Sequence, residues 1–405
     1  MKQQTKQLNE VANVTSGFAF KSSEFTKEGI PIIRISNISD GEEVLILDKN
    51  QPCYNKEIND KLKNFMLKKE DILIALSGAT TGKIGIYREE KPALLNQRIA
   101  LIRSRDEKSN YYVYYFLQTK SQQILKEAYG GAQPNISPIT LKSYDIYWPE
   151  KVEERQKIVS AIESKFSKID NAIKNLKSAK TKIQLYKKAV LKKAFEKGEP
   201  KTFPDIISKE KHSMKRGPFG GSLKKEIFVP SGYLVYEQYH PINNDFKFGR
   251  YFITKEKFEE MKGFSVKPGD FLISCSGTIG KIAEIPKENF RGGIINQALL
   301  KITLDETKID KKYFNYLFNS DYIQKYLTTI SRGVAIKNVP SVKELKEIKF
   351  PVPSLPLQQT IVADIESKFS VIDKVEEIVD NSLKKAEMLK KSILKSAFEG
   401  RLVKE

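Results

Sequence analysis

The residues with the clearest chemical potential form a glycine-rich turn that ends in lysine. Gly78-Ala-Thr-Thr-Gly-Lys83 is similar to a nucleotide-binding P-loop, but a P-loop has four residues between its glycines and a Ser or Thr after its lysine. Here three residues intervene and Ile84 follows, and a second copy, Gly277-Thr-Ile-Gly-Lys281, has only two. Two copies of different length cannot cradle the same phosphates, so we expect no bound nucleotide. The turn can instead contact a duplex backbone through amides, hydroxyls and an ammonium, or it is a tight strand–strand turn.

Residues for catalysis or metal binding are scarce. The chain has only two cysteines, Cys53 and Cys275, and two histidines, His212 and His240. Structural zinc needs four closely placed Cys/His ligands, and no such spacing occurs. A Gly-x-Ser-x-Gly nucleophile elbow and the Asn/Asp-Pro-Pro-Tyr/Phe stretch of an amino-methyltransferase are also absent from the sequence. We therefore expect a binding protein rather than an enzyme, with no cofactor and no metal.

The charge balance predicts a polyanionic partner. Lys and Arg number 70 against 50 Asp and Glu, which gives a formal net charge of +20. Such a surplus favours nucleic acid first and an anionic membrane second. No run reaches the roughly 18 apolar residues of a membrane span, and sparse cysteine fits a reducing compartment. We expect a cytoplasmic protein that binds no membrane.

Polar and aromatic side chains follow predicted strands at equivalent places in the two halves of the chain. Arg34-Ile-Ser-Asn37 corresponds to Glu237-Gln-Tyr-His240. Asn and Gln can read adenine edges, Arg guanine and Glu cytosine. The two segments differ, which indicates either two domains that read different sequences or drift after duplication. The candidate DNA contacts are Arg34, Ser36, Asn37, Ser77, Thr80, Thr81, Lys83, Asn96, Gln97, Arg98, Tyr236, Gln238, Tyr239, His240, Ser276, Thr278, Lys281, Asn296, Gln297, Lys337 and Asn338.

An internal repeat must position these side chains, because self-similarity at a fixed distance sets the architecture of a chain. Ile162-Glu-Ser-Lys-Phe-Ser-Lys-Ile-Asp170 recurs 203 residues later as Ile365-Glu-Ser-Lys-Phe-Ser-Val-Ile-Asp373. Looser matches precede it, among them Asn96-Gln97 with Asn296-Gln297. The chain thus alternates variable and fixed units, and we expect domains at 1–150, 151–200, 201–353 and 354–405.

The variable units are predicted to be mixed α/β. In the first, short buried strands are expected at 30–35, 71–76 and 94–102, and a helix at 111–128. The second unit repeats this order at 233–238, 271–275, 294–302 and 311–327.

The fixed units are predicted to be long helices with a coiled-coil seam, since their apolar residues step alternately by four and three. A helix of about 45 residues spans roughly 65–70 Å and cannot bury its seam alone. We expect the two helices to pair antiparallel within the chain; a generic bundle or a homodimeric coiled coil is the alternative. The seam residues are Ile162, Phe166, Ile169, Ile173 and Leu176 in the first helix and Ile365, Phe369, Ile372, Val379 and Leu383 in the second.

The whole pattern resembles the specificity (S) subunit of type I restriction–modification systems. The motifs that carry the resemblance, repeated around two long helices, are Ser16-Gly-Phe-Ala-Phe-Lys21, Ser77-Gly-Ala-Thr-Thr-Gly-Lys83, Asn96-Gln97, Gln156-Lys-Ile-Val159 and Lys192-Lys-Ala-Phe195. The resemblance covers nearly the whole chain. In the second unit, Gly217-Pro-Phe-Gly-Gly-Ser222 departs from the Ser-Gly-Phe-Ala-Phe start, which leaves the second domain start open.

The resemblance implies a function in a larger complex. Two target-recognition domains would each read one half of a split, asymmetric DNA site through the major groove. The helices would set the spacer length and dock two methyltransferase subunits, which carry S-adenosylmethionine and methylate adenine N6. Two restriction–translocase subunits would join for cleavage, and this chain would do no chemistry itself.

Three other functions stay open at this point. The same two-domain reader could serve a methyltransferase-only assembly. A general nucleic-acid scaffold, for DNA or RNA, fits the charge but not the duplicated and diverged loops. A coiled-coil structural adaptor explains the helices but leaves two α/β domains without a role.

Overall fold

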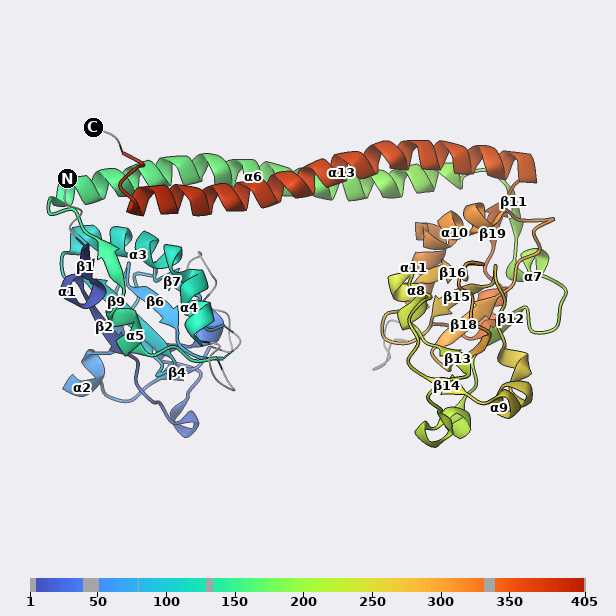
Figure 1. Ribbon diagram of the computed structural model, residues 1–405, viewed down its shortest axis with the longest axis horizontal. Helices are drawn as coiled ribbons and strands as arrows, with labels where there is room; N and C mark the ends of the chain where they lie inside the picture. The colour runs from blue at the N-terminus through green and yellow to red at the C-terminus, as the bar shows by residue number, and fades with distance from the viewer. Residues whose placement is uncertain (1–4, 39–50, 79, 129–133, 331–338, 404–405) are drawn as a thin grey trace. The chain divides into compact units, whose positions relative to one another are not determined.

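The computed structural model consists of two compact units, and it describes residues 5–38, 51–78, 80–128, 134–330 and 339–403. Unit 1 comprises Met1–Lys177 and Asp380–Glu405, and unit 2 comprises Ser178–Val379. Two long helices, α6 (Val152–Ala194) and α13 (Leu355–Phe398), each contribute one segment to either unit (Figure 1). The four-part division expected from the sequence stays a prediction.

Unit 1 is built on two four-stranded sheets. Its elements are β1 (Thr5–Gln7), α1 (Leu8–Val11), β2 (Ala12–Ser16), β3 (Ile30–Ile33), β4 (Cys53–Tyr54), α2 (Asp60–Lys63), β5 (Met66–Leu67), β6 (Ile72–Ala75), β7 (Ile84–Ile86), β8 (Ala93–Leu95), β9 (Ile99–Ser104), α3 (Asn110–Thr119), α4 (Ser121–Ala128), α5 (Pro138–Lys142) and β10 (Asp145–Tyr147). One sheet has the order β2-β9-β6-β7 and is antiparallel; the other has the order β4-β3-β8-β5, with β3 and β8 parallel. The two sheets share a core that includes Ile33, Leu73 and Leu101.

Unit 2 repeats this plan with one strand fewer in its second sheet. Its elements between the long helices are β11 (Glu199–Lys201), α7 (Phe203–Ile206), β12 (Met214–Arg216), β13 (Tyr233–Tyr236), α8 (Tyr239–Asn243), β14 (Phe252–Ile253), α9 (Lys255–Glu260), β15 (Phe271–Ser274), β16 (Ile282–Glu284), β17 (Gly293–Ile295), β18 (Leu299–Ile302), α10 (Lys311–Asn319), α11 (Asp321–Ile330), α12 (Val342–Lys346) and β19 (Phe350–Val352). The sheets have the orders β12-β18-β15-β16 and β14-β13-β17, and β13 and β17 are parallel. The mixed α/β prediction is confirmed for both units.

Two kinds of predicted element are interrupted. The single strand expected at 94–102 is wrong, because the backbone turns at Asn96, whose carbonyl accepts from the N–H of Ile99, and β8 and β9 join different sheets. The same break separates β17 from β18 after Asn296. The single helix expected at 111–128 is also broken, into α3 and α4 at Lys120. Each broken strand therefore carries a turn where two sheets meet.

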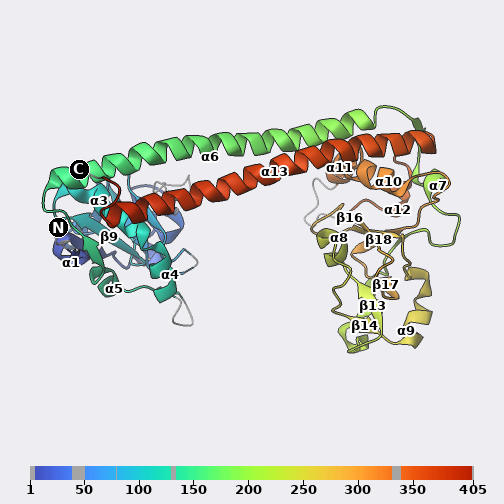
Figure 2. The ribbon, with the colours of Figure 1, turned by 45° about the horizontal axis from the view of Figure 1, so that its top comes forward.

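In each unit a segment of α6 lies beside a segment of α13 (Figures 1 and 2). In unit 1 the Lys390 ammonium pairs with the Asp170 carboxylate, and in unit 2 the Lys187 ammonium lies 2.8 Å from Asp373 and 2.6 Å from Glu376. Within unit 2, Gln184 also donates to Glu376, whereas Val190 shares a core with Ile365. The residue numbers of the contacts in α13 fall as those in α6 rise, so the intramolecular antiparallel pairing is confirmed.

The predicted seam residues of the two long helices are buried or half-buried. Ile162 and Ile365 are fully buried, and Ile169, Ile372 and Val379 are nearly so. The remaining seam residues are half-buried: Phe166, Ile173, Leu176, Phe369 and Leu383. Phe166 and Phe369 also contact aromatic rings of the globular parts, Tyr115 and Tyr316, so the stripe is covered from two sides.

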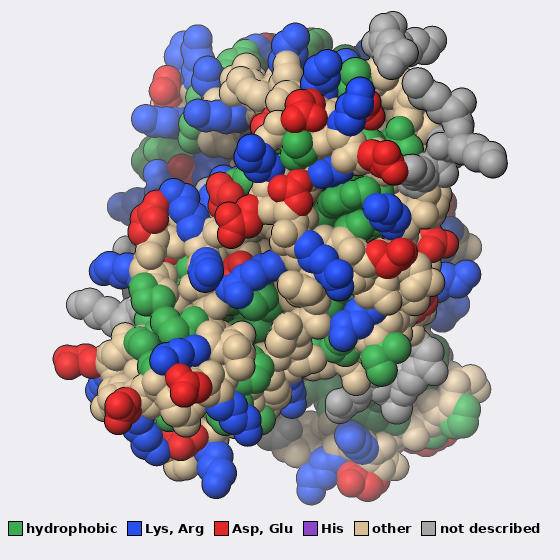
Figure 3. All heavy atoms as spheres, turned by 90° about the vertical axis from the view of Figure 1, so that its left-hand side faces the viewer, with side chains coloured by type: hydrophobic (Ala, Val, Ile, Leu, Met, Phe, Trp, Pro, Cys, Tyr) green, Lys and Arg blue, Asp and Glu red, His purple; other side chains and the backbone are tan. Residues whose placement is uncertain are grey.

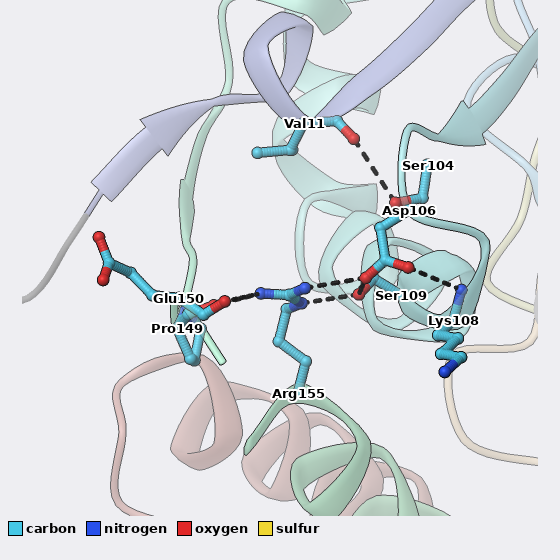
Figure 4. Close-up of polar contacts among 8 residues, drawn as sticks. All are labelled: Val11, Ser104, Asp106, Lys108, Ser109, Pro149, Glu150 and Arg155. Carbon is cyan, nitrogen blue, oxygen red and sulfur yellow. Dashed lines mark hydrogen bonds and ion pairs between the residues drawn. The ribbon is translucent and has the colours of Figure 1, made fainter. Parts of the chain in front are cut away.

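Arg155 fastens the start of α6 to the globular part of unit 1 (Figure 4). Its side chain is 5% exposed and donates to the Ser109 hydroxyl at 2.6 Å, to the Asp106 carboxylate at 2.9 Å and to the carbonyls of Pro149 and Glu150. Burial pushes the pKa of Asp106 up, but hydrogen bonds from Ser109, Arg155 and the Lys108 backbone outweigh it and leave that pKa below its usual value. The contacts of Arg155 with Ser109, Asp106, Pro149 and Glu150, called the clasp below, thus hold an ionised carboxylate.

Unit 2 uses a neutral clasp at the equivalent helix position, 203 residues later. Gln358 is fully buried, accepts from the N–H of Asp310 at 2.7 Å and donates to the carbonyls of Lys308 and Pro353. The far end of each helix closes the same junction with an aromatic pair, Phe398 on Tyr112 in unit 1 and Phe195 on Tyr313 in unit 2. The equivalent junction between helix and globular part therefore contains an ion pair in unit 1 and only neutral hydrogen-bonding groups around Gln358 in unit 2.

Arg155→Leu should destabilise unit 1 by about 2 kcal/mol, because it removes the cation that pairs with the Asp106 carboxylate and the hydrogen bonds that the guanidinium donates to the Ser109 hydroxyl and to the Pro149 carbonyl. The chain has one tryptophan, Trp148, whose ring lies 4.3 Å from the Arg155 guanidinium. Its fluorescence during urea unfolding therefore reports on unit 1. The exposed neighbour Lys157→Ala is the matched control and should leave the unfolding midpoint unchanged. Equal midpoints for both variants would contradict a stabilising clasp.

The clasp should also make unit 1 acid-sensitive. The lowered pKa of Asp106 means that its stabilising contribution is complete above the unfolded-state pKa, about 3.9, and is lost as the pH falls through the folded-state value. In the wild-type chain the Trp148 unfolding midpoint should drop in that window. The drop should be smaller in Arg155→Leu. If this variant had the same pH profile as the wild type, the contact between Arg155 and Asp106 would not be the cause of the acid sensitivity.

Candidate nucleic-acid interface

The candidate contacts gather where two parallel strands end. In unit 1 the parallel strands β3 and β8 end at Ile33 and Leu95, and the Asn96 N–H donates to the Ile33 carbonyl at 3.1 Å. In unit 2 the Asn296 N–H donates to the Tyr236 carbonyl at 3.0 Å. The carboxyl ends of adjacent parallel strands are a common position for ligand sites. This geometry makes Arg34 and Glu237, the residues that follow β3 and β13, structural equivalents.

A glycine allows a third segment to approach each edge. The Gly17 N–H bonds to the Ile99 carbonyl and the Gly217 N–H to the Leu299 carbonyl, at 3.0 and 2.9 Å. A Cβ atom on Gly17 would lie 2.2 Å from the Asn96 carbonyl oxygen, and one on Gly217 would lie 1.9 Å from that of Asn296. Gly217 therefore occupies the position equivalent to that of Gly17, although the motifs around the two glycines differ.

The glycine-rich turns close the strand pairs β6–β7 and β15–β16 beside these edges. The Leu76 N–H donates to the Arg98 carbonyl, and the Cys275 N–H donates to the Ala298 carbonyl. The Thr81 hydroxyl is turned inward and donates to the Gly78 carbonyl at 2.6 Å. The tight-turn interpretation is therefore correct, and contact of these turns with phosphate stays a prediction.

Asn37 and His240 lie in the interior and perform the same local task. The Arg34 N–H donates to Oδ1 of Asn37 at 2.9 Å, and the Glu237 N–H donates to Nδ1 of His240 at 3.0 Å. Asn37 is 4% exposed and His240 is fully buried. Our expectation that they read bases needs correction, because their polar groups cap the turn that presents the preceding residue.

Three more candidates are buried and bonded internally or packed under the edge. The hydroxyl of Tyr236 donates to the Arg291 carbonyl at 2.7 Å. Thr81 and Asn96 are also less than a tenth exposed. The three side chains are largely covered and support the edge, and their contact with DNA stays a prediction.

The other candidates remain accessible to different degrees. The exposed candidates are Arg34, Ser36, Gln97, Arg98, Tyr239, Thr278, Lys281 and Gln297. Half-buried are Ser77, Thr80, Lys83, Gln238, Ser276 and Asn296. Lys337 and Asn338 fall outside the described residues. Whether any of them touches DNA stays a prediction.

Unit 2 also has a pocket at its edge that the sequence did not reveal. It has a volume of about 210 Å³, and Glu237, Asn296 and Gln297 line it. Its remaining lining residues are mostly apolar: Pro218, Leu223, Phe228, Val235 and Tyr251. Tyr251 comes close because its carbonyl accepts from the Val235 N–H, a pairing that residue types alone do not indicate. A few polar groups among apolar walls are typical of a specific binding site.

Basic side chains are spread over one face of unit 1. On this face, drawn in Figure 3, Lys and Arg side chains occur across the visible surface, with acidic side chains between them.

The described residues offer little for catalysis or metal binding. Burial raises the pKa of the Cys275 thiol to about 12, so this thiol is not a nucleophile at neutral pH. Within the described ranges, no cluster of three or more His, Cys, Asp or Glu could hold a metal ion. Among the described helices, none is long and apolar enough to cross a bilayer.

Comparison with known proteins connects this architecture to one family. The family model for the "Type I restriction modification DNA specificity domain" matches residues 2–184 and 220–384. The EcoBI specificity subunit of Escherichia coli is 27% identical over 427 residues, covering 98% of this chain and 85% of that protein. The MjaVIII specificity subunit of Methanocaldococcus jannaschii is 24% identical over 370 residues, covering 84% and 81%.

A solved structure has the same fold. It is described as "Structural basis underlying complex assembly and conformational transition of the type I R-M system", and one of its chains superimposes with a TM-score of 0.74 at 14% identity, covering 98% of both chains.

Gly217→Ala should disrupt the edge of unit 2 and cost about 2–4 kcal/mol of its stability, since backbone rather than a flexible side chain blocks the new methyl group. Hydrogen exchange in peptides spanning β17 and β18 should rise, while peptides of unit 1 stay unchanged. Gly277→Ala is the control, because no atom lies within 4 Å of its Cβ position and its positive φ costs about 1 kcal/mol. Equal exchange in the two variants would refute the close approach.

Proposed function

We infer that this chain, which belongs to the type I restriction–modification DNA specificity family, is the DNA-recognition subunit of a type I restriction–modification system. The chain is non-catalytic, and chemistry belongs to its partners. One observation carries the mechanism: the same edge is built twice, with equivalent backbone hydrogen bonds at Asn96 and Asn296, but with different side chains at its tip. A shared frame with different tips fits two readers of different sequences.

Each unit, in this proposal, reads one half of a bipartite site. Base contacts come from the tips, where Arg34 can donate to guanine and Glu237 can accept from cytosine. Phosphate contacts come from the basic turns at Lys83 and Lys281. Because lysines and arginines exceed acids by 20, affinity should fall steeply with salt.

The helix pair, we propose, sets the distance between half-sites and docks the methyltransferase subunits. Two copies of that subunit are expected, because the repeats expose equivalent apolar pairs. Leu185 and Tyr186 are 60% and 53% exposed, and Met388 and Leu389, at the same places in α13, are 60% and 51% exposed. Restriction–translocase subunits would join this complex in the cytoplasm, where chromosomal DNA lies.

A methylation map tests the specificity role. The chain would be expressed with its neighbouring methyltransferase gene in a methylation-free host, and native DNA would be sequenced by a single-molecule method. We expect one bipartite motif with methyl-adenine in both halves, lost when this chain is omitted. No methylation from a folded, associated complex would overturn the proposal.

Shortening the helix pair tests the ruler. Removing residues 174–180 and 380–386 takes one heptad from each helix. Asp170 and Lys187 keep their ion-pair partners, because none of these residues is removed. The rise of about 1.5 Å per residue predicts a change of about 10 Å. The methylated motif should then have a spacer about three base pairs shorter, given about 3.4 Å per base pair, or methylation should be lost. An unchanged spacer would refute the ruler.

A further inference from the structure

Glu237 presents a carboxylate that is not satisfied by the protein. It follows β13 directly and lines the 210 Å³ pocket with Asn296 and Gln297. In the part of the chain that the structure describes, this carboxylate forms neither an ion pair nor a hydrogen bond. Beside it, the side-chain oxygen of Gln238 is buried and likewise has no hydrogen-bond partner among the described residues. The Glu237 carboxylate is therefore an acceptor that a ligand with a hydrogen-bond donor can use.

The backbone of Glu237 is nevertheless held firmly. Its N–H donates to Nδ1 of His240 at 3.0 Å, and its carbonyl accepts from the His240 N–H at 3.0 Å. The other ring nitrogen, Nε2, lies 3.2 Å from the Phe248 carbonyl. His240 is fully buried, so the turn is fixed before any ligand arrives. A group presented on a fixed turn loses little conformational entropy on binding.

Electrostatics restrict what this carboxylate can face. A carboxylate at an edge that meets DNA is repelled by phosphate, and also by guanine O6 and N7 and by thymine O4. In the major groove only cytosine N4 and adenine N6 present amino donors. In adenine the N7 lone pair lies beside the amine and would repel a carboxylate. In cytosine the C5–H group lies beside the amine and carries no lone pair. The apolar wall of Val235, Phe228 and Tyr251 suits that carbon edge, which favours cytosine.

We propose that Glu237 is the specificity-determining residue of unit 2 and that it selects a cytosine through the N4 amine. The inference rests on the proposed DNA-reading function and deepens it. In unit 1 the structurally equivalent position holds Arg34, a donor of opposite charge, which selects the opposite type of base edge. The two half-sites therefore differ at the equivalent position because one carboxylate replaces one guanidinium.

Removing the amine from the DNA tests the proposal without altering the protein. Once the motif is mapped, each cytosine of the half-site read by unit 2 is replaced by a 2-pyrimidinone nucleotide, which lacks only the 4-amino group. Duplex affinity is measured by fluorescence anisotropy with the assembled complex of this chain and its methyltransferase subunits. We expect a loss of about 5- to 150-fold at one position. Unchanged affinity at every position would overturn the proposal.

Two variants assign the effect to this residue. Glu237→Ala should bind the natural and the substituted duplex equally at that position. Lys281→Ala, on the same edge, should weaken both duplexes yet keep the difference between them. A Glu237→Ala complex that retains the full difference would overturn the assignment. Failure of the proposed function itself is distinguishable, because the wild-type complex would then prefer no duplex before any substitution is made.

A charge exchange gives a second readout. Glu237→Arg should move the methylated motif from cytosine to guanine at one position of one half-site and leave the other half intact. A motif unchanged in both halves, from a folded complex, would contradict the proposal. If this variant fails to fold, the 2-pyrimidinone measurement on the wild-type protein still decides the question.

Discussion

The structure depends on one constraint: a long amphipathic helix cannot bury an apolar stripe by itself. Each unit solves this by placing a segment of α6 against a segment of α13, and the charged interruptions of the stripe then pair with each other. Lys187 with Asp373 and Glu376, and Lys390 with Asp170, fix the register that apolar side chains alone would leave free to slip. Arg155 and Gln358 then bond the start of each helix to the globular part of its own unit.

The two edges show how a duplicated frame separates positioning from selection. Backbone bonds at Asn96 and Asn296, glycines that permit close approach, and a buried cap on the next turn are common to both. The cap is an amide in one unit and an imidazole in the other, although the geometry it enforces is the same. The residue it presents changes from Arg34 to Glu237, which reverses the charge at the tip. In the proposed function, specificity can therefore diverge there without disturbing the frame.

The sequence predicted the parts whose signal is local and periodic. The seam repeats every three or four residues over more than 40 positions, so the long helices and their pairing could be predicted. The break between β8 and β9 could not, because tertiary hydrogen bonds to Ile33 and Gly17 turn an otherwise uniform apolar run. Asn37 and His240 were misjudged for a related reason. A polar residue after a strand can face a ligand or cap a turn, and only burial separates the two.

Unit 1 is assembled from the first 177 residues and from the segment that begins at Asp380. Leu394 and Ala397 belong to its core, and Phe398 packs against it. A ribosome adding about 5–20 residues per second needs roughly 10–40 s to make the intervening stretch. During that time the nascent first domain lacks the α13 segment that completes its core, whereas unit 2 is continuous in sequence. Translation order therefore requires the domain made first to wait for the last segment of its core.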